Sequence, residues 1–128
     1  MIIKDMTVVN EKGKEFELEV YINTKSIMAI ERDLKKLNPK YNYFNALGLI
    51  EKGEMSVVLT YVCNCVHKRG EKRPVGIDFF DDNDIDYFKY SRDLISKLAE
   101  CLEDNHPTVN HIFLKRFQFQ QNLTFLHH

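Results

Sequence analysis

The stretch "MSVVLTYVCNCV", residues 55–66, is the most apolar segment of this chain of 128 residues. Its apolar residues recur at the spacing of one helical face, namely Met55, Val58, Leu59, Val62 and Val66. Val57, Tyr61 and Cys65 widen that face, so the segment is apolar nearly all round. A helix of this kind must be buried. The sequence therefore predicts a central helix over residues 54–68, against which the other elements pack.

The N-terminal residues predict a β-hairpin. Apolar residues alternate with polar ones from Phe16 to Ile22, and a period of two is typical of a half-buried strand. A second apolar run, residues 2–9, precedes it, and the two runs are joined by the glycine-containing link "NEKGK". A lone hairpin is marginally stable in water, so we expect this one to pack on the helices.

Two helices are predicted between the hairpin and the central segment. Asn23 or Thr24 can cap the first, and Asn38-Pro39 ends it, because a residue before proline avoids the helical region. Its apolar stripe consists of Ile27, Ile30, Leu34 and Leu37. The second helix is shorter and ends at Gly53. Its stripe consists of Tyr43, Ala46, Leu47 and Ile50.

A final helix is predicted over residues 84–104, carrying Ile85 and Phe88 on its early apolar positions and capped by Asp82, Asn83 and Asp84. These elements together give an α+β fold, mainly α, with an N-terminal β-hairpin followed by a small bundle of three to four helices. We expect a single globular domain over residues 1–106, with the hairpin in 1–22 and the helical part in 23–106. Residues 107–128 form an aromatic-rich C-terminal tail.

Composition excludes several classes of protein. Hydrophobic residues make up 44% of the chain and charged residues 29%, and the formal net charge is −1. This balance is ordinary for a globular protein and gives no global field that attracts nucleic acid or an anionic membrane. The three cysteines and the N-terminus "MIIKDMTVV" show neither a disulfide framework nor a signal peptide. No segment has the roughly 20 apolar residues of a membrane helix. We expect a cytoplasmic protein.

The cluster Cys63, Cys65 and His67 has the composition of a metal site. On a helix, however, residues i and i+2 point about 200° apart, so the two cysteines cannot reach one metal ion. We expect the cysteines to be buried small hydrophobes and His67 to lie near the C-terminus of the helix, where positive charge is favoured.

The acidic run that begins at Asp82 fits positions 1, 3, 5 and 12 of a calcium-binding loop with Asp82, Asp84, Asp86 and Asp93. Tyr87 occupies position 6, where that loop requires glycine. The sequence also lacks a glycine-rich phosphate loop, a G-x-S-x-G elbow and an H-E-x-x-H pair, and Cys101 with His106 lacks a third group. We expect no metal, no cofactor and no catalytic residues.

Three surface segments are candidates for binding. The tail segment "HIFLKRFQF" interleaves aromatic and basic residues, as protein interfaces do. We predict partner contacts at Phe113, Lys115, Arg116, Phe117 and Phe119. Phe16, Leu18 and the open edge of the hairpin are further candidates, although those two side chains suit a core equally well.

The basic loop at residues 68–73 carries Lys68, Arg69, Lys72 and Arg73. These cations can contact phosphates, or they can simply follow a helix end, as cations commonly do.

The order of these elements carries a family resemblance. The hairpin is followed by "TKSIMAIERDLKKLN", "FNALGLIEKGEMS", "VVLTYVCNCVHKRG" and the acidic-started "DDNDIDYFKYSRDLISKLAECLED". Over residues 15–104 this layout resembles the tail assembly chaperones of long-tailed phages (siphophages) and related prophages. The resemblance rests on the pattern of elements and on no invariant motif.

The resemblance implies a non-enzymatic protein of the bacterial cytoplasm that binds the phage tape measure protein. Such chaperones keep the apolar helices of the tape measure soluble until tail tube subunits polymerise around it. The resemblance implies self-association into a homo-oligomer and makes the tail tube protein a second possible partner. Two alternatives stay open. One is a small nucleic-acid-binding regulatory or adaptor domain that uses the 68–73 loop, and the other is a different self-assembling phage structural protein.

Overall fold

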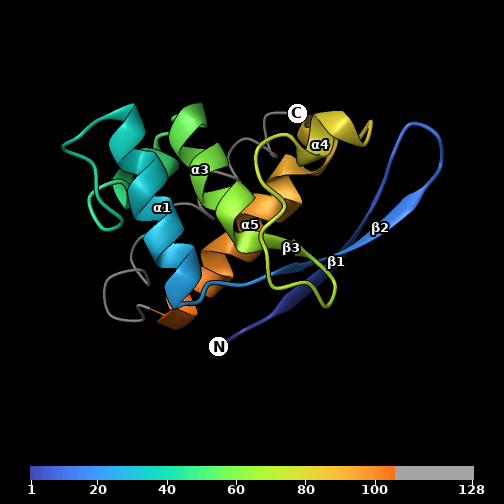
Figure 1. Cartoon of the computed structure of the whole chain (residues 1–128), viewed down its shortest axis with the longest axis horizontal. Coiled ribbons are helices and arrows are strands. Elements are labelled where there is room, and N and C mark those ends of the chain that lie inside the picture. Colours follow the sequence, from blue (N-terminus) through green and yellow to red (C-terminus); the bar gives the residue numbers. More distant parts are fainter. Residues whose placement is uncertain (106–128) are drawn as a thin grey trace, which may run out of the picture.

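The computed structural model describes residues 1–105, which form a three-stranded antiparallel sheet and five helices. The α+β, mainly α prediction is confirmed. The sequence pattern predicted three or four helices, and the one it missed has only four residues. The elements, shown in Figure 1, are β1 (Lys4–Val9), β2 (Glu15–Val20), α1 (Thr24–Leu37), α2 (Leu47–Glu51), α3 (Met55–Cys65), β3 (Val66–Lys68), α4 (Phe79–Asp82) and α5 (Tyr87–Asn105).

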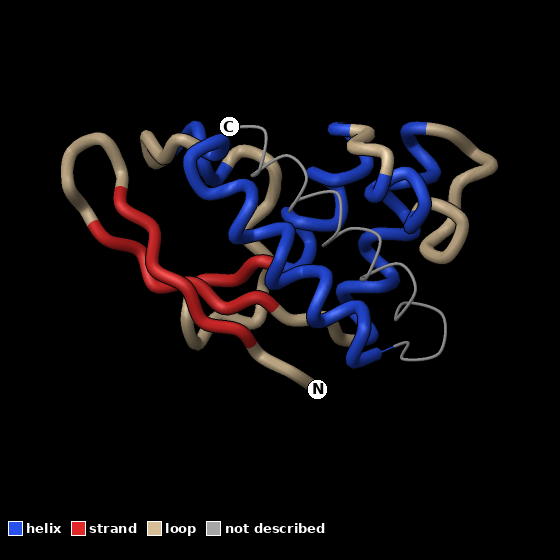
Figure 2. The backbone as a smooth tube through the Cα atoms, turned by 180° about the vertical axis from the view of Figure 1, so that it is seen from behind, coloured by secondary structure: helices blue, strands red, loops and turns tan. Residues whose placement is uncertain are grey.

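The helices form one side of the molecule and the sheet the other. Helix α3 lies between α1 and α5, and α5 also packs across β1 and β2 (Figures 1 and 2). The Ile2 backbone N–H donates to the carboxylate of Asp104 at 3.2 Å, so the start of the chain lies beside the end of α5. No helix within residues 1–105 combines the length and the apolar character needed to cross a bilayer.

The predicted hairpin is confirmed. Its strands pair in antiparallel register from Lys4 opposite Val20 to Val9 opposite Glu15. The Asn10 side-chain oxygen accepts hydrogen bonds from two backbone N–H groups of the turn, and Gly13 supplies the left-handed backbone (φ 83°) that closes it. Leu18 is fully buried, while Phe16 is half-buried with its ring 5.7 Å from that of Phe79. Leu18 is therefore a core residue and not a partner contact.

The predicted end of the central helix is wrong. Helix α3 ends at Cys65, and Val66 is already extended (φ −94°, ψ 131°), so residues 66–68 form β3 and pair with β2. The reason is that the outer edge of β2 carries backbone groups that need partners. Tyr21 N–H donates to the Cys65 carbonyl at 3.0 Å, and Arg69 N–H donates to the Glu17 carbonyl at 2.9 Å. The hairpin edge that we expected to be open is therefore covered on the β2 side.

The last predicted helix begins three residues later than predicted, at Tyr87 instead of residue 84. Asp84 has a left-handed backbone (φ 57°), which separates the short α4 from α5. The cap of α5 is Asp86, whose side-chain oxygen accepts the Phe88 N–H at 3.1 Å, and not the earlier acidic residues that we predicted. Ile85 is buried, but it precedes α5. Phe88, predicted to be apolar core, is 73% exposed.

The predicted caps and stripes of the earlier helices are largely confirmed. Asn23 caps α1 in a capping box, in which its side-chain oxygen accepts the Ser26 N–H at 2.8 Å and the Ser26 hydroxyl oxygen accepts the Asn23 N–H at 3.2 Å. Leu37 departs from the prediction, because it lies at the end of α1 and is 47% exposed. All four residues of the second stripe are buried, although only Leu47 and Ile50 belong to α2.

Helix α3 is the buried element that the sequence predicted. Val57, Val58 and every residue from Tyr61 to Cys65 are buried, whereas Met55 at its start is exposed. The Tyr61 hydroxyl donates to the backbone carbonyl of Tyr43, which ties α3 to the segment before α2. The core of the protein is thus organised around α3.

Replacing Val62 with Asp should unfold the protein. Val62 is 1% exposed, and an unpaired carboxylate at this position loses its hydration without gaining a partner. We expect a loss of roughly 3 kcal/mol or more in the free energy of unfolding, measured by urea denaturation followed by circular dichroism. The control is Ser56→Asp, at an exposed position in the first turn of α3. Equal stability of the two variants would show that α3 is not core.

Candidate functional site

The three cysteines lie inside the fold. Cys63 and Cys65 are buried, as predicted, Cys101 is buried as well, and none of the three forms a disulfide. Burial raises the pKa of Cys63 and of Cys101 to about 11, and it raises the pKa of Cys65 well above its ordinary value. The nucleophilic form of cysteine is the thiolate. At neutral pH these side chains are therefore protonated and act as small hydrophobic residues.

We predicted His67 near the C-terminus of the central helix. This is wrong, because α3 ends two residues before it. It belongs to β3, is 1% exposed and stacks on Tyr21 with 3.8 Å between ring centroids. Burial lowers the pKa of His67, although hydrogen bonds with the backbone of Glu19 and Cys65 act in the opposite direction. Its Nδ1 atom is buried without a hydrogen-bond partner among the described residues. His67 is a neutral core residue.

Cys63 lies in α3 and His67 in β3, so the two residues do not share one helix. Within residues 1–105, no three His, Cys, Asp or Glu side chains come together in a way that would hold a metal ion. The acidic run from Asp82 to Asp93 forms no such cluster either. His106 lies outside the described residues.

The basic loop is divided between two roles. Lys68 lies over the ring of Phe79, with its Nζ atom 5.8 Å from the ring centroid. Arg69 lies 3.5 Å from the carboxylate of Glu17 and 3.9 Å from that of Asp5. Lys72 and Arg73 line instead a cleft beside α1. Within residues 1–105 these two cations make no ion pair and no cation–π contact.

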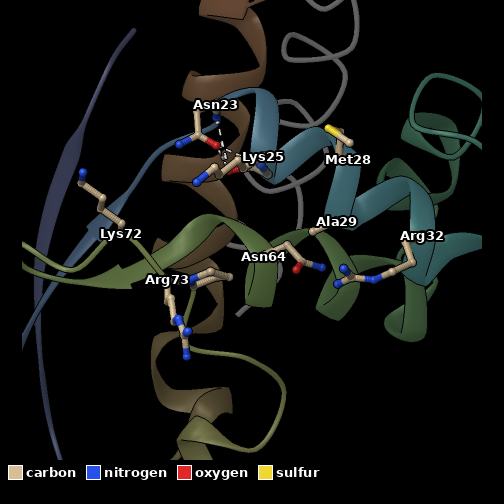
Figure 3. Close-up of a pocket in the computed structure, with 10 residues that line it drawn as sticks. Asn23, Lys25, Met28, Ala29, Arg32, Asn64, Lys72 and Arg73 are labelled. Carbon is tan, nitrogen blue, oxygen red and sulfur yellow. Dashed lines mark hydrogen bonds between the residues drawn. The ribbon is translucent and has the colours of Figure 1, made fainter.

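Lys72 and Arg73 line a cleft of about 660 Å³ between α1 and the loop after β3. Figure 3 shows Lys25, Met28 and Arg32 projecting from α1, with Asn64 of α3 between Arg32 and the loop. We call this site the cationic cleft. Its lining residues are Asn23, Lys25, Ser26, Met28, Ala29, Arg32, Asn64, Lys72, Arg73 and Pro74.

The charges of the cationic cleft have one sign. Four of its ten lining residues are lysine or arginine, and none is Asp or Glu. Arg32 pairs with Asp33, with 3.2 Å between Nε and Oδ1. Within residues 1–105, Lys25, Lys72 and Arg73 make no ion pair. The cleft can therefore attract and bind an anionic group.

Both walls of the cleft are fixed by the fold. The capping box sets the start of α1, and the loop is held by an isolated β-bridge between His67 and Pro74. The Val75 N–H also donates to the Val66 carbonyl at 2.8 Å. These contacts place Lys72 and Arg73 opposite α1.

Asn64 forms part of the floor and is 8% exposed. Its amide donates to the Asp33 carboxylate at 3.0 Å and to the Thr60 carbonyl at 2.8 Å. Partial burial acts to raise the pKa of Asp33, but the hydrogen bond from Asn64 and the contacts with Arg32 and Lys36 outweigh it and hold the pKa below its usual value. Asp33 therefore stays charged at neutral pH and keeps both Asn64 and Arg32 in place.

Sequence reasoning identified only half of this site. Lys72 and Arg73 belong to the predicted basic loop, but Lys25 and Arg32 were not predicted, because they lie about 40 residues away on a helix with an ordinary polar face. The predicted tail residues Phe113, Lys115, Arg116, Phe117 and Phe119 lie outside the described residues. Their role as partner contacts remains a prediction.

No protein-family model, no curated protein and no solved structure matches this chain. The resemblance to tail assembly chaperones therefore stands on the sequence pattern alone.

Stability should fall as the pH is lowered through the titration range of His67. In the unfolded chain His67 takes up a proton near its ordinary pKa of 6.5, whereas the folded pKa is lower. The unfolded state thus binds more protons below pH 6.5, and the free energy of unfolding decreases there by at most about 1.4 kcal/mol per pH unit for one group.

Urea denaturation at pH 7.5 and at pH 5.5 measures this difference. The control variant is His67→Phe, which keeps a ring beside Tyr21 but cannot be protonated. The other four histidines lie within residues 106–128 in both proteins, so their contribution cancels. We expect the variant to lose less stability than the native chain. The same loss in both would assign the pH dependence to other groups.

Proposed function

We propose that this protein is a non-enzymatic tail assembly chaperone of a phage or prophage, which binds the tape measure protein in the cytoplasm of the bacterial host. The observation that carries the proposal is the cationic cleft, a recessed surface that combines basic side chains with the exposed Met28. This combination suits a segment of polypeptide. The buried, protonated thiols and the neutral His67 agree with a binding role.

The proposed client consists of long apolar helices, which need a surface that shields them from one another. Methionine suits such a surface because its flexible, polarisable side chain adapts to different partners. Met28 is 67% exposed, and five more large apolar residues of the helical part are exposed, namely Leu37, Phe44, Met55, Ile77 and Phe88. The aromatic tail would add to this surface. Self-association and binding to the tail tube protein belong to the same proposal.

A second candidate is a nucleic-acid-binding adaptor, and one observation favours it. The cleft joins Lys72 and Arg73 of the basic loop to Lys25 and Arg32 of α1, which concentrates positive charge on one surface. Binding to phosphates weakens steeply with salt, because each neutralised phosphate releases a counterion. Binding through apolar contacts does not. Salt dependence therefore separates the two candidates.

Co-expression with the tape measure protein of the same phage or prophage tests the proposal. We expect the client to be soluble only when both are expressed, and the two to co-purify in salt from about 0.1 M to about 0.5 M. Expression of the client alone is the control. A client that stays insoluble while this protein elutes alone would contradict the proposal. Salt-sensitive capture of RNA or DNA would favour the adaptor, and polymerisation without a client would favour a structural protein.

A further inference from the structure

We propose that the cationic cleft binds an acidic, amphipathic stretch of polypeptide. Carboxylates of the bound stretch contact Lys25, Arg32, Lys72 and Arg73, and one of its apolar side chains contacts Met28. The inference rests on the proposed function, under which the acidic stretch belongs to the tape measure protein. It adds which surface recognises the client and which chemistry the client must carry.

The charge arrangement requires an anionic ligand. Four cationic side chains line one cleft with no acidic lining residue, and within residues 1–105 only Arg32 of the four has an ion-pair partner, Asp33. Lys25 of α1 and Lys72 and Arg73 of the loop after β3 belong to the lining of the same cleft (Figure 3). A carboxylate between the walls contacts cations from both sides. The two arginines can also bind it through paired N–H groups, which fixes its orientation.

The apolar part of the lining requires a ligand that is not only charged. Met28, Ala29 and Pro74 belong to the same cleft, and Met28 is 67% exposed. An amphipathic helix presents acidic and apolar side chains side by side, because residues three and four positions apart lie on neighbouring parts of its surface. A volume of about 660 Å³ accepts a few such side chains and not a whole helix. The rest of the bound stretch would lie across the rim.

The same observations disfavour a nucleic acid. No lining residue of the cleft is aromatic, so bases have no stacking platform. The chain has a net charge of −1 and is not a basic domain. Acidic side chains also lie close to the cleft, with Asp33 behind Arg32 and the exposed Glu71 beside Lys72. An extended phosphate backbone would meet these carboxylates, whereas a short acidic stretch makes its contacts within the cleft.

The test uses a labelled helical peptide of about 20 residues with Glu and Leu at amphipathic spacing, and a second peptide in which Gln replaces every Glu. Fluorescence anisotropy measures the Kd of each with the full chain. The cleft variant is Lys72→Gln/Arg73→Gln. Its matched control is Lys68→Gln/Arg69→Gln, which removes the same charge from the same loop outside the cleft.

We expect the native chain to bind the Glu peptide roughly tenfold or more tightly than the Gln peptide. The cleft variant should lose roughly tenfold in affinity and the control variant little. Lys25→Gln, on the opposite wall, should weaken binding as well and serves as the readout if the double variant does not fold. Equal losses in cleft and control variants would overturn the inference, as would no preference for the Glu peptide. Tighter binding of a single-stranded DNA oligonucleotide through the same residues would also overturn it.

Pull-down with the tape measure protein separates this inference from the proposed function. If the native chain and the cleft variant retain the client equally, the inference fails and the chaperone function stands. If the native chain binds the Glu peptide through the cleft but does not retain the client, the proposed function fails and the cleft remains a site for acidic segments.

Discussion

The passage from α3 into β3 without an intervening loop is the constraint on which the rest of the structure depends. One apolar segment fills the centre of the helical side and then completes the sheet. At the junction the Cys65 carbonyl accepts the Tyr21 N–H at 3.0 Å, and Val66 lies opposite Val20. The two sides of the molecule are therefore joined by covalent backbone as well as by packing. The same junction directs the following loop back past α1, where its Lys72 and Arg73 form one wall of the cationic cleft.

The sequence was sufficient where a local signal decided the local structure. Asn23, one of the two predicted caps, begins α1, Asn38-Pro39 ends it, and alternation around Leu18 predicts the hairpin. The end of α3 could not be predicted in this way, because Val66 and His67 suit the helical pattern as well as a strand. The unpaired edge of β2, about 50 residues earlier, decides between them.

The start of α5 was also predicted wrongly, because contacts with a distant part of the chain decide it. The acidic run offers several residues that can cap a helix. The left-handed conformation at Asp84 coincides with contacts from the hairpin turn, where Glu11 N–H donates to the Asp84 carbonyl at 3.0 Å and the Asn10 amide donates to the Asn83 carbonyl at 3.0 Å. The cationic cleft likewise combines residues from α1, α3 and a distant loop, so its charge is visible only once the fold places them together.

The residues that make the sequence look reactive do not belong to the cationic cleft. The thiols and the histidine that make the sequence look reactive are neutral core residues, whereas the unremarkable lysines and arginines of α1 and the loop form the recessed surface. Binding of an acidic stretch in the cationic cleft is measured most directly by the backbone amide chemical shifts of the protein. On titration of the ¹⁵N-labelled chain with the Glu/Leu peptide, we predict shift changes concentrated in residues 23–32 and in Lys72 and Arg73, with the hairpin turn at residues 10–14 unaffected. Changes centred on any other surface, or no changes at all, would contradict the claim.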